Sequence, residues 1–341
     1  MKTADFFYDL PETAIAQTPI EPRDAARLLD TRDMTDRRFE ELPHMLEAGD
    51  LLVVNRTRVR AARLLGTKSE TGGAVETLLL SQTGDGGWDA LIKPARRVRA
   101  GLRIEFARGL NAVVRQAPVD GRCIIEFPGR DDHELPDLIE AIGQVPLPPY
   151  IREPLADASR YQTVYANEVG SAAAPTAGLH FTENVLKSLA ERGVERAHVD
   201  LEVGLDTFRP ISVEEVEDHR MHSEKVLVPE ETCAAISATR RRGGRIVAVG
   251  TTVVRSLESA ADEDGIVHPF DAATALFINP GYRFRAVDGL ITNFHVPGST
   301  LVVLVAAILG NRWRAAYEEA LERGYRFLSF GDAMYAEVKR L

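Results

Sequence analysis

The chain changes its residue pattern along its length, and this change constrains the fold more than any other feature. Residues 59–127 hold short apolar runs separated by glycine-rich turns at spacings near ten, whereas residues beyond 150 alternate between helical and strand-like segments. Short strands with glycine turns are typical of a small antiparallel barrel, and alternating helices and strands are typical of an α/β sheet. The barrel strands are expected at residues 59–66, 74–80, 88–92, 102–106, 112–114 and 123–127.

An apolar run at residues 51–54 precedes the barrel pattern and resembles the buried strands found after it. We therefore predict an α/β fold in which a discontinuous α/β catalytic domain carries an inserted small antiparallel β-barrel. The α/β domain is expected to comprise residues 1–58 and 151–341. The inserted domain, residues 59–150, is expected to end in a short helix at 135–142 and a proline-rich return linker.

Within the α/β part, the apolar run 245–249 is the type of strand that is buried in a parallel sheet. Other strands are expected at 194–203, 290–294 and 325–330. Capping residues, apolar spacing and glycine stops predict helices at 12–17, 182–193, 212–218, 229–242, 251–261, 300–309 and 312–323.

Composition excludes several classes of protein. The hydrophobic fraction of 45% is too high for a disordered chain, and two cysteines are too few for a disulfide scaffold or a thiolate zinc site. No apolar run is long enough to span a membrane, and the first residues lack the apolar core of a signal peptide. We expect a cytoplasmic protein without a membrane partner. The net charge of −10 argues mildly against a nucleic-acid partner, although a total can hide a local basic stripe.

Three predicted strand-to-helix junctions carry polar side chains, at residues 250–252, 293–300 and 174–181. Ligands bind in open α/β sheets at the carboxyl ends of strands, where helix N-termini offer free N–H groups. Taken singly, each junction has a plain structural explanation, since threonine and serine cap helices and a buried histidine can simply pack. Three such junctions in one domain favour a composite pocket.

The segment 218–224 has the spacing of metal ligands, because His219 and His222 would share one face of a helix. No third ligand is obvious, so a metal is not expected. A solvated helix end, or a pocket role for His222 or Glu224, are the other interpretations.

Basic residues cluster on either side of the start of the barrel. Residues 55–63 hold four arginines, and residues 93–108 hold six basic side chains against Glu105, a local sum of +5. A charge run is usually a solvated surface, but these two clusters could also bind phosphates.

The segment AAPTAGLHF at residues 173–181 resembles a signature of the S-adenosylmethionine:tRNA ribosyltransferase-isomerases, a family of queuosine-biosynthesis enzymes. The resemblance extends through most of the chain. Its other blocks are DLPE at 9–12, GDLLVVN at 49–55, PLPPYI at 146–151, YQTVY at 161–165, MHSE at 221–224, AVGTT at 248–252, SLE at 256–258, TNFH at 292–295, YRF at 325–327 and GDAM at 331–334.

The resemblance implies an α/β domain interrupted by a β-barrel, and it implies a reaction. The ribosyl part of S-adenosylmethionine, the co-substrate, is transferred to a 7-aminomethyl-7-deazaguanine at the tRNA wobble position. It rearranges into an epoxy-cyclopentane, adenine and methionine leave, and the product is epoxyqueuosine in tRNA. The partner is therefore tRNA carrying that base, and a monomer is expected.

This chemistry needs a base for the proton on the 5′ carbon, which the sulfonium acidifies, and a proton for the departing adenine. The candidate catalytic residues are His180, His295, His222, Glu224 and Glu258, which the sequence alone does not rank. The candidate S-adenosylmethionine-binding residues are Thr176, Gly178, Thr207, Gly250, Thr251, Thr252 and Asn293. The candidate RNA-binding residues are Arg58, Lys93, Arg96, Arg97 and Arg99.

The chain departs from the family pattern at residues 202–208, where the usual His-Val-Gly-x-Gly-Thr-Phe is replaced by EVGLDTF. Glu202 stands in place of a histidine and Asp206 in place of a glycine. This departure is consistent with a subgroup variant, or with a paralogue that uses S-adenosylmethionine on a different RNA or small-molecule amine. A non-catalytic RNA-binding protein is a separate alternative, which the retained histidines and the segment Gly250-Thr251-Thr252 argue against.

Overall fold

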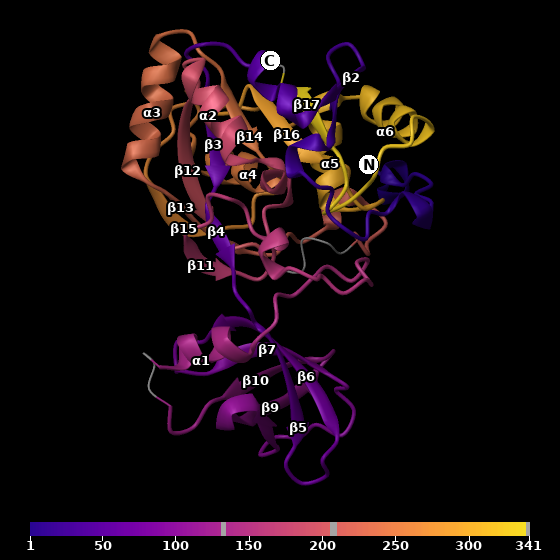
Figure 1. The fold of residues 1–341 in the computed structure, drawn as a ribbon, viewed down its shortest axis with the longest axis vertical. Coiled ribbons are helices and arrows are strands. Elements are labelled where there is room, and N and C mark those ends of the chain that lie inside the picture. Colours follow the sequence, from indigo (N-terminus) through magenta and orange to yellow (C-terminus); the bar gives the residue numbers. More distant parts are fainter. Residues whose placement is uncertain (131–133, 205–209, 339–341) are drawn as a thin grey trace. The chain divides into compact units, whose positions relative to one another are not determined.

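The computed structural model describes residues 1–130, 134–204 and 210–338. The chain forms two compact units, one comprising Met1–Arg58 and Pro148–Leu341 and the other Val59–Leu147 (Figure 1). The first unit is built on a large mixed sheet with helices, and the second is a closed antiparallel barrel. The predicted fold class, an α/β fold with an inserted small antiparallel β-barrel, is confirmed.

The large sheet of the first unit has nine strands in the order β15-β13-β12-β3-β14-β16-β17-β1-β2. At its centre, β3 pairs in parallel with β12 and β14, and β14 pairs in parallel with β16. The strands are β1 Arg27–Asp30, β2 Thr35–Arg38, β3 Leu51–Asn55, β12 Glu195–Leu201, β13 Glu224–Val228, β14 Ile246–Val249, β15 Phe270–Thr274, β16 Gly289–Asn293 and β17 Ala333–Glu337. Two further strands, β4 Thr57–Val59 and β11 Glu168–Ser171, form a separate pair.

Both faces of this sheet are covered, because successive side chains of its strands point to opposite sides. In β3, Leu51 and Val53 belong to one apolar core, while Leu52 and Val54 belong to another. The first core includes residues of α3 Glu230–Arg241, α4 Thr251–Ala260, α5 Thr300–Leu309 and α6 Arg312–Glu322, and the second includes residues of α2 Glu183–Glu191. Within the described residues, no helix is long and apolar enough to span a bilayer.

The second unit closes its six strands in the order β10-β7-β6-β5-β8-β9, and every neighbouring pair is antiparallel. Alternate side chains such as Leu64, Ile104 and Val114 fill the interior, and Ile139 of the adjacent helix belongs to the same core. The elements are β5 Arg63–Lys68, β6 Ala74–Gln82, β7 Trp88–Lys93, β8 Arg103–Phe106, β9 Asn111–Val119, β10 Arg122–Glu126 and α1 Leu135–Ile142.

The strand predicted at residues 325–330 is wrong. Leu328 has a φ of 69°, which interrupts extended backbone, and Phe327 makes only an isolated bridge to Ile15. The last strand is instead β17, which begins at Ala333. The strand predicted at 59–66 is also divided, because residues 60–62 separate β4 from β5.

The helix predicted at residues 212–218 is only a short 3₁₀ turn at Val216–Asp218. The N-terminal segment explains the difference, since Thr3 donates to the Glu214 carbonyl and Val216 donates to the Met1 carbonyl. These bonds take the Glu214 carbonyl and the Val216 N–H out of any α-helical pairing before the turn. His219 and His222 consequently lie outside any helix, and their predicted helical spacing is wrong. The helix predicted at 12–17 is likewise a single 3₁₀ turn, Glu12–Ala14.

A buried ion pair joins the beginnings of two neighbouring parallel strands. Asp50 immediately precedes β3 and Arg245 immediately precedes β14. The Asp50 carboxylate accepts hydrogen bonds from the Arg245 backbone N–H at 2.9 Å and from its Nη2 at 2.5 Å, and from the Glu47 N–H at 2.9 Å. Burial alone would raise the pKa of Asp50, but the hydrogen bonds from Arg245 and Glu47 hold it below its ordinary value.

Asp50→Asn should destabilise the first unit by about 2–4 kcal/mol, because it leaves a partly buried guanidinium without its counter-charge. Urea unfolding in a Trp88→Phe background measures this, since Trp313 fluorescence then reports on the first unit. The matched control is Glu12→Gln, which removes an exposed pair with Arg152 and should cost less than about 1 kcal/mol. Equal losses in the two variants would contradict the assigned role of Asp50.

Candidate functional site

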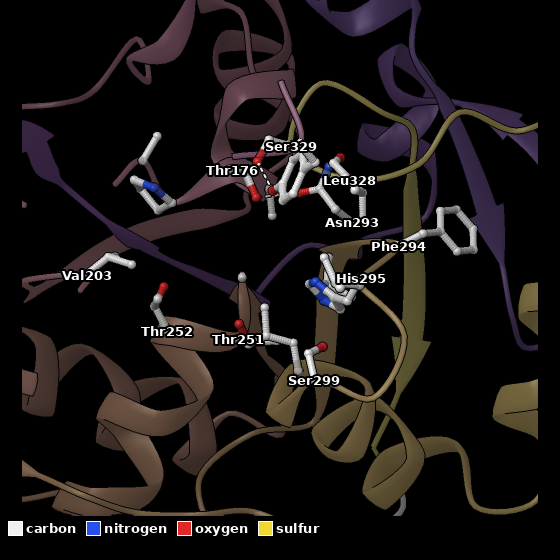
Figure 2. A pocket seen from close by; sticks show the side chains of 18 residues that line it. Thr176, Val203, Thr251, Thr252, Asn293, Phe294, His295, Ser299, Leu328 and Ser329 are labelled. Atoms are coloured by element: carbon white, nitrogen blue, oxygen red, sulfur yellow. Dashed lines mark hydrogen bonds between the residues drawn. The ribbon is translucent and has the colours of Figure 1, made fainter. Parts of the chain in front are cut away.

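A polar pocket lies at the carboxyl ends of β14 and β16 and beside the N-termini of α4 and α5. It encloses about 550 Å³ including its open mouth. In the view of Figure 2, Thr176 and Asn293 lie on one side, Thr251 and Ser299 lie on the other, and His295 lies between them. Segments more than a hundred residues apart in the chain therefore line one cavity.

Gly250 makes the turn from β14 into α4. Its φ of 89° is a conformation that glycine adopts readily, and it donates its N–H to the Ile291 carbonyl of β16 at 2.8 Å. Thr251 and Thr252 follow at the first turn of α4, both line the pocket, and no threonine side chain caps this helix. The Thr252 hydroxyl is buried without a hydrogen-bond partner in the described chain. This junction therefore holds an unused polar group inside the cavity.

Thr176 and Asn293 form a fixed polar wall. The Thr176 hydroxyl donates to the Asn293 side-chain oxygen at 2.9 Å, and the Asn293 amide nitrogen donates to the Leu328 carbonyl at 3.2 Å. These bonds determine which end of the amide is oxygen. Among the predicted binding residues, the structure brings Thr176, Gly250, Thr251, Thr252 and Asn293 into this one pocket.

His295 is the histidine that lines this pocket. Its Nε2 is 2.8 Å from the Thr292 hydroxyl, and among the described residues Nδ1 has no hydrogen-bond partner. Tyr8 donates to the His295 carbonyl, which fixes the backbone. Burial lowers the pKa of His295 to about 3, so the ring is neutral at pH 7 and can accept a proton.

Sequence reasoning missed two residues of this pocket, Tyr150 and Ser329. Their hydroxyls are 2.7 Å apart, and both side chains line the cavity. Tyr150 is the last residue of the proline-rich connector, whose composition predicts a linker and gives no sign of a pocket residue. Ser329 was assigned to a strand that does not form. The signal that could have identified them is their place in the family pattern: Tyr150 lies in the block PLPPYI, and Ser329 lies between the blocks YRF and GDAM.

His180 lies in a different place. It lines a second, smaller hollow together with Arg23 and Arg160, and it is absent from the lining of the first pocket. Its Nε2 is 3.1 Å from the Gly331 carbonyl. Burial, with the charges of Arg326 and Arg23, lowers its pKa to about 3. The two histidines that the sequence could not rank are therefore separated by the fold.

Glu224 is held in a buried charge cluster outside the lining of the first pocket. It pairs with Arg255, accepts from the Gly204 N–H at 2.9 Å and lies 3.2 Å from His222 Nε2. Burial alone would raise the pKa of Glu224, but the hydrogen bond from His222 and the charge of Arg255 keep it low. Arg255 was not anticipated from the sequence, although it lies one helical turn after Thr251.

Glu258 is hydrogen-bonded to a loop of the same unit. Its carboxylate accepts hydrogen bonds from the backbone N–H groups of Arg285, Ala286 and Val287 at 2.9–3.2 Å, and from the Tyr282 hydroxyl at 3.2 Å. Burial raises its pKa. Because these donors occupy both oxygens and Glu258 does not line the pocket, the geometry favours an anchor for the loop over a catalytic base.

Gly178 is required by packing, because a Cβ there would lie 2.2 Å from the Tyr165 hydroxyl, and it does not line the pocket. Thr207 and Asp206 lie outside the described residues. Glu202 is exposed and its side chain lies against Gly170, while the next residue, Val203, lines the pocket.

The predicted RNA-binding residues are distributed over both units. Lys93, Arg96, Arg97 and Arg99 are exposed on the barrel unit, where Arg99 pairs with Glu70 at 3.0 Å. Arg58 is partly buried in β4. Among the described residues, no three His, Cys, Asp or Glu side chains gather in a way that could hold a metal ion.

An α/β unit with a polar pocket at the carboxyl ends of its parallel strands belongs to a class of proteins that bind small molecules at this edge. Comparison with known proteins narrows this class. Residues 3–336 match the family model described as "Queuosine biosynthesis protein". The chain belongs to this family, and the resemblance seen in the sequence is confirmed.

Several relatives match over nearly their whole length. An S-adenosylmethionine:tRNA ribosyltransferase-isomerase of Symbiobacterium thermophilum is 53% identical over 98% of this chain and 99% of its own. The enzyme of that name from Acetivibrio thermocellus is 48% identical, with the same coverage. The crystal structure of S-adenosylmethionine tRNA ribosyltransferase from Thermotoga maritima is 38% identical, with a TM-score of 0.54, over 97% of this chain and 99% of that chain.

The low histidine pKa values predict a pH-dependent stability. A histidine with a folded pKa of about 3 and an unfolded pKa of about 6.5 binds fewer protons when folded, so stability is complete above about pH 6.5 and falls as the pH drops toward 3. The burial of neutral His295 should therefore lower the free energy of unfolding by about 2 kcal/mol at pH 5 relative to pH 7.

Urea unfolding at pH 7 and pH 5 checks this value. His295→Gln should lose about 2 kcal/mol less than the original chain between the two pH values. The control, His44→Gln at an exposed site, should keep the original decrease. If the stability of His295→Gln falls between pH 7 and pH 5 by as much as that of the original chain, this histidine is not held neutral by the fold.

Proposed function

We propose that this chain transfers the ribosyl moiety of S-adenosylmethionine to 7-aminomethyl-7-deazaguanine at the wobble position of tRNA and isomerises it to give epoxyqueuosine-tRNA. Adenine and methionine are released. The names of relatives about 50% identical over the full chain support this assignment. The observation that carries it is the pocket in which a neutral histidine with an unpaired ring nitrogen lies among the hydroxyl and amide groups of three strand-to-helix junctions.

The pocket suits an adenosyl group. Its lining mixes apolar side chains such as Val203 with the polar groups of Thr251, Thr252 and Asn293, as small-molecule sites do. The Thr252 hydroxyl is buried and unpaired within the described chain, so a ligand hydroxyl or ring nitrogen would satisfy it. We assign ribose and adenine recognition to these residues.

His295 is the proposed general base. The reaction begins when a proton leaves the 5′ carbon, which the neighbouring sulfonium makes acidic. A base must be uncharged to accept this proton, and burial keeps His295 neutral. A pKa of about 3 also makes the ring a weak base, so the assignment rests on the place of His295 in the pocket and on its unpaired Nδ1. When Nε2–H donates to Thr292, the lone pair of Nδ1 is available for the proton. Thr292 is then a positioning residue that sets the tautomer of the ring.

The same pKa argues against His295 as the group that protonates adenine. A proton donor must carry its proton at the working pH, and a histidine with a pKa of about 3 does not. Tyr150, whose hydroxyl reaches Ser329 at the pocket wall, is the proton carrier that we propose for the leaving base. Burial raises the pKa of Tyr150, which keeps its hydroxyl protonated but makes it a weak acid, so this assignment rests on the position of the hydroxyl at the pocket wall.

An adenine-release assay tests the function. The chain is incubated with S-adenosylmethionine and tRNA bearing the aminomethyl base, and both free adenine and tRNA mass are measured. Both should increase, and adenine release should require the modified tRNA. His295→Gln should lower kcat about 10²–10⁴-fold, the usual contribution of a general base, while the control His44→Gln keeps full activity.

The outcomes separate the alternatives. Adenine release without the modified tRNA would indicate a paralogue that acts on a different amine, for which the replacements at Glu202 and Asp206 are the motivation. Salt-sensitive tRNA binding without adenine release would indicate a non-catalytic RNA-binding protein. Full activity of His295→Gln would refute the assigned base.

The barrel's basic surface gives a separate prediction. Changing Arg96 and Arg97 together to Gln should weaken tRNA binding about tenfold at moderate salt and reduce the slope of log affinity against log salt by about 2. Both side chains are exposed, so the fold should persist. Fluorescence anisotropy over a salt series measures both quantities, and an unchanged slope would remove this surface from the RNA interface.

A further inference from the structure

A second hollow of about 270 Å³, including its mouth, lies beside the first pocket, and the two share Ser329 in their linings. Arg23, Arg160 and His180 line it, and the function proposed above gives it no role. All three side chains are partly or fully buried. Guanidinium groups donate hydrogen bonds and carry positive charge, and a neutral imidazole accepts one hydrogen bond. A ligand that fits this hollow should therefore have an anionic group and a donor group.

His180 offers an acceptor in this hollow. A carbonyl oxygen can only accept, so the 3.1 Å contact between Nε2 and the Gly331 carbonyl places the ring proton on Nε2. Nδ1 therefore carries a lone pair, and it is buried without a donor among the described residues. The Phe39 ring packs on the imidazole at a centroid distance of 5.1 Å, which fixes its orientation. A ligand that pairs with His180 must supply an O–H or N–H group.

The two arginines offer donors and positive charge. Arg23 donates to the Gln162 and Ser159 carbonyls at 2.6 and 2.9 Å, and Arg160 donates to the Ile20 carbonyl at 2.7 Å. These acceptors fix both guanidinium groups but do not neutralise them.

The Nε of Arg160 is buried and has no acceptor among the described residues. Burial and the charge of Arg160 lower the pKa of Arg23, so the two cations repel each other.

Positive charge exceeds negative charge around the hollow. Arg326 is a third guanidinium whose charge acts on His180. Against these three cations stand Glu21, which is 76% exposed and pairs with Arg160, and Asp157, an exposed carboxylate that acts on Arg23. Two buried carboxylates, Asp24 and Asp332, adjoin the lining in sequence, but Asp24 accepts from the Thr182 hydroxyl and Asp332 accepts from backbone N–H groups, and in the described chain neither forms an ion pair with these arginines. Partly buried cations whose paired carboxylate is exposed favour an anion that can approach from the mouth.

We propose that this hollow binds one ribose–phosphate unit of the substrate RNA strand, an inference that rests on the proposed tRNA substrate. The phosphodiester oxygens accept from Arg160 and Arg23, and the neighbouring 2′-hydroxyl donates to Nδ1 of His180. Because Nδ1 is covered by its neighbours, seating the hydroxyl requires a small movement of side chains at the mouth. The site thereby distinguishes RNA from DNA.

An amino-acid end group, with its carboxylate and ammonium, would also present an anion and a donor. The charges argue against it, because its ammonium would lie among three guanidinium groups, whereas a ribose hydroxyl is neutral. This alternative makes a different prediction: changes in the hollow would then weaken the binding of S-adenosylmethionine and leave RNA binding unchanged.

Anisotropy with a labelled anticodon stem-loop RNA tests the proposal. Arg160→Gln should weaken binding about tenfold and lower the salt slope by about 1, as expected for the loss of one charged hydrogen-bond donor. Arg152→Gln, an exposed arginine outside the hollow, is the matched control and should bind normally. Glu21→Gln should tighten binding about threefold, because it removes the carboxylate that competes for Arg160.

A scan of single 2′-deoxy substitutions identifies the hydroxyl. A 2′-deoxy substitution at one loop position should lower the affinity of the original chain about fivefold and leave the affinity of His180→Gln unchanged. The glutamine amide nitrogen replaces Nε2 as the donor to Gly331, and no acceptor then stands at the position of Nδ1. Steady-state kinetics should show a raised KM for tRNA with kcat retained in Arg160→Gln. Thermal melting of each variant separates these effects from unfolding, and the tighter binding of Glu21→Gln is a gain that misfolding cannot produce.

Equal RNA affinity in Arg160→Gln and Arg152→Gln would overturn the proposal. A raised KM for S-adenosylmethionine with unchanged RNA affinity would assign the hollow to an amino-acid end group and would also overturn it. Neither result affects adenine release by the original chain, so failure here is distinct from failure of the proposed function.

Discussion

The site depends on the parallel pairing of β3 with β12 and β14 and of β14 with β16. This pairing aligns Val249 with Ile291, and the Gly250 N–H continues it by donating to the Ile291 carbonyl. The chain therefore leaves β14 and β16 at one edge of the sheet, and two threonines meet Asn293 and His295 there. Asp50 acts at the opposite end of the same strands, where it joins the start of β3 to the start of β14. A shift in that register would separate the groups of the pocket without changing any of them.

Two neutral histidines occupy two cavities that share Ser329. Both have a low pKa because both are buried, yet their partners differ. Nδ1 of His295 is left unpaired beside Thr292 in a pocket lined by apolar and hydroxyl groups. The charges of Arg326 and Arg23 act on His180, which shares its hollow with Arg160. The first setting suits removal of a proton from a carbon, and the second suits a phosphodiester and its ribose. The fold thus gives two histidines different roles, because it surrounds them with different groups.

The sequence predicted the barrel, the junctions and the four central strands of the sheet, β12, β3, β14 and β16, because buried parallel strands are continuous apolar runs and tight turns need glycine. It missed the outer strands β1, β2, β13, β15 and β17. It failed where distant segments decide the local structure. Residues 212–218 have a helix-capping pattern, but backbone pairing with Met1 and Thr3 uses the Glu214 carbonyl and the Val216 N–H and leaves only a 3₁₀ turn at Val216–Asp218. The sequence pattern is compatible with Glu258 as a base, but the backbone N–H groups of a distant loop occupy its carboxylate. Arg255, Tyr150 and Ser329 carried no local signal strong enough to place them, since their roles come from contacts across the fold.

The central claim is that proton removal occurs at His295 and RNA binding at His180. Single-turnover adenine release at saturating modified tRNA measures this most directly. The account predicts that His295→Gln loses at least about a hundredfold in the single-turnover rate, while His180→Gln keeps the original rate and needs more tRNA to reach it. A normal rate in His295→Gln, together with a rate in His180→Gln that no concentration of tRNA restores, would contradict it.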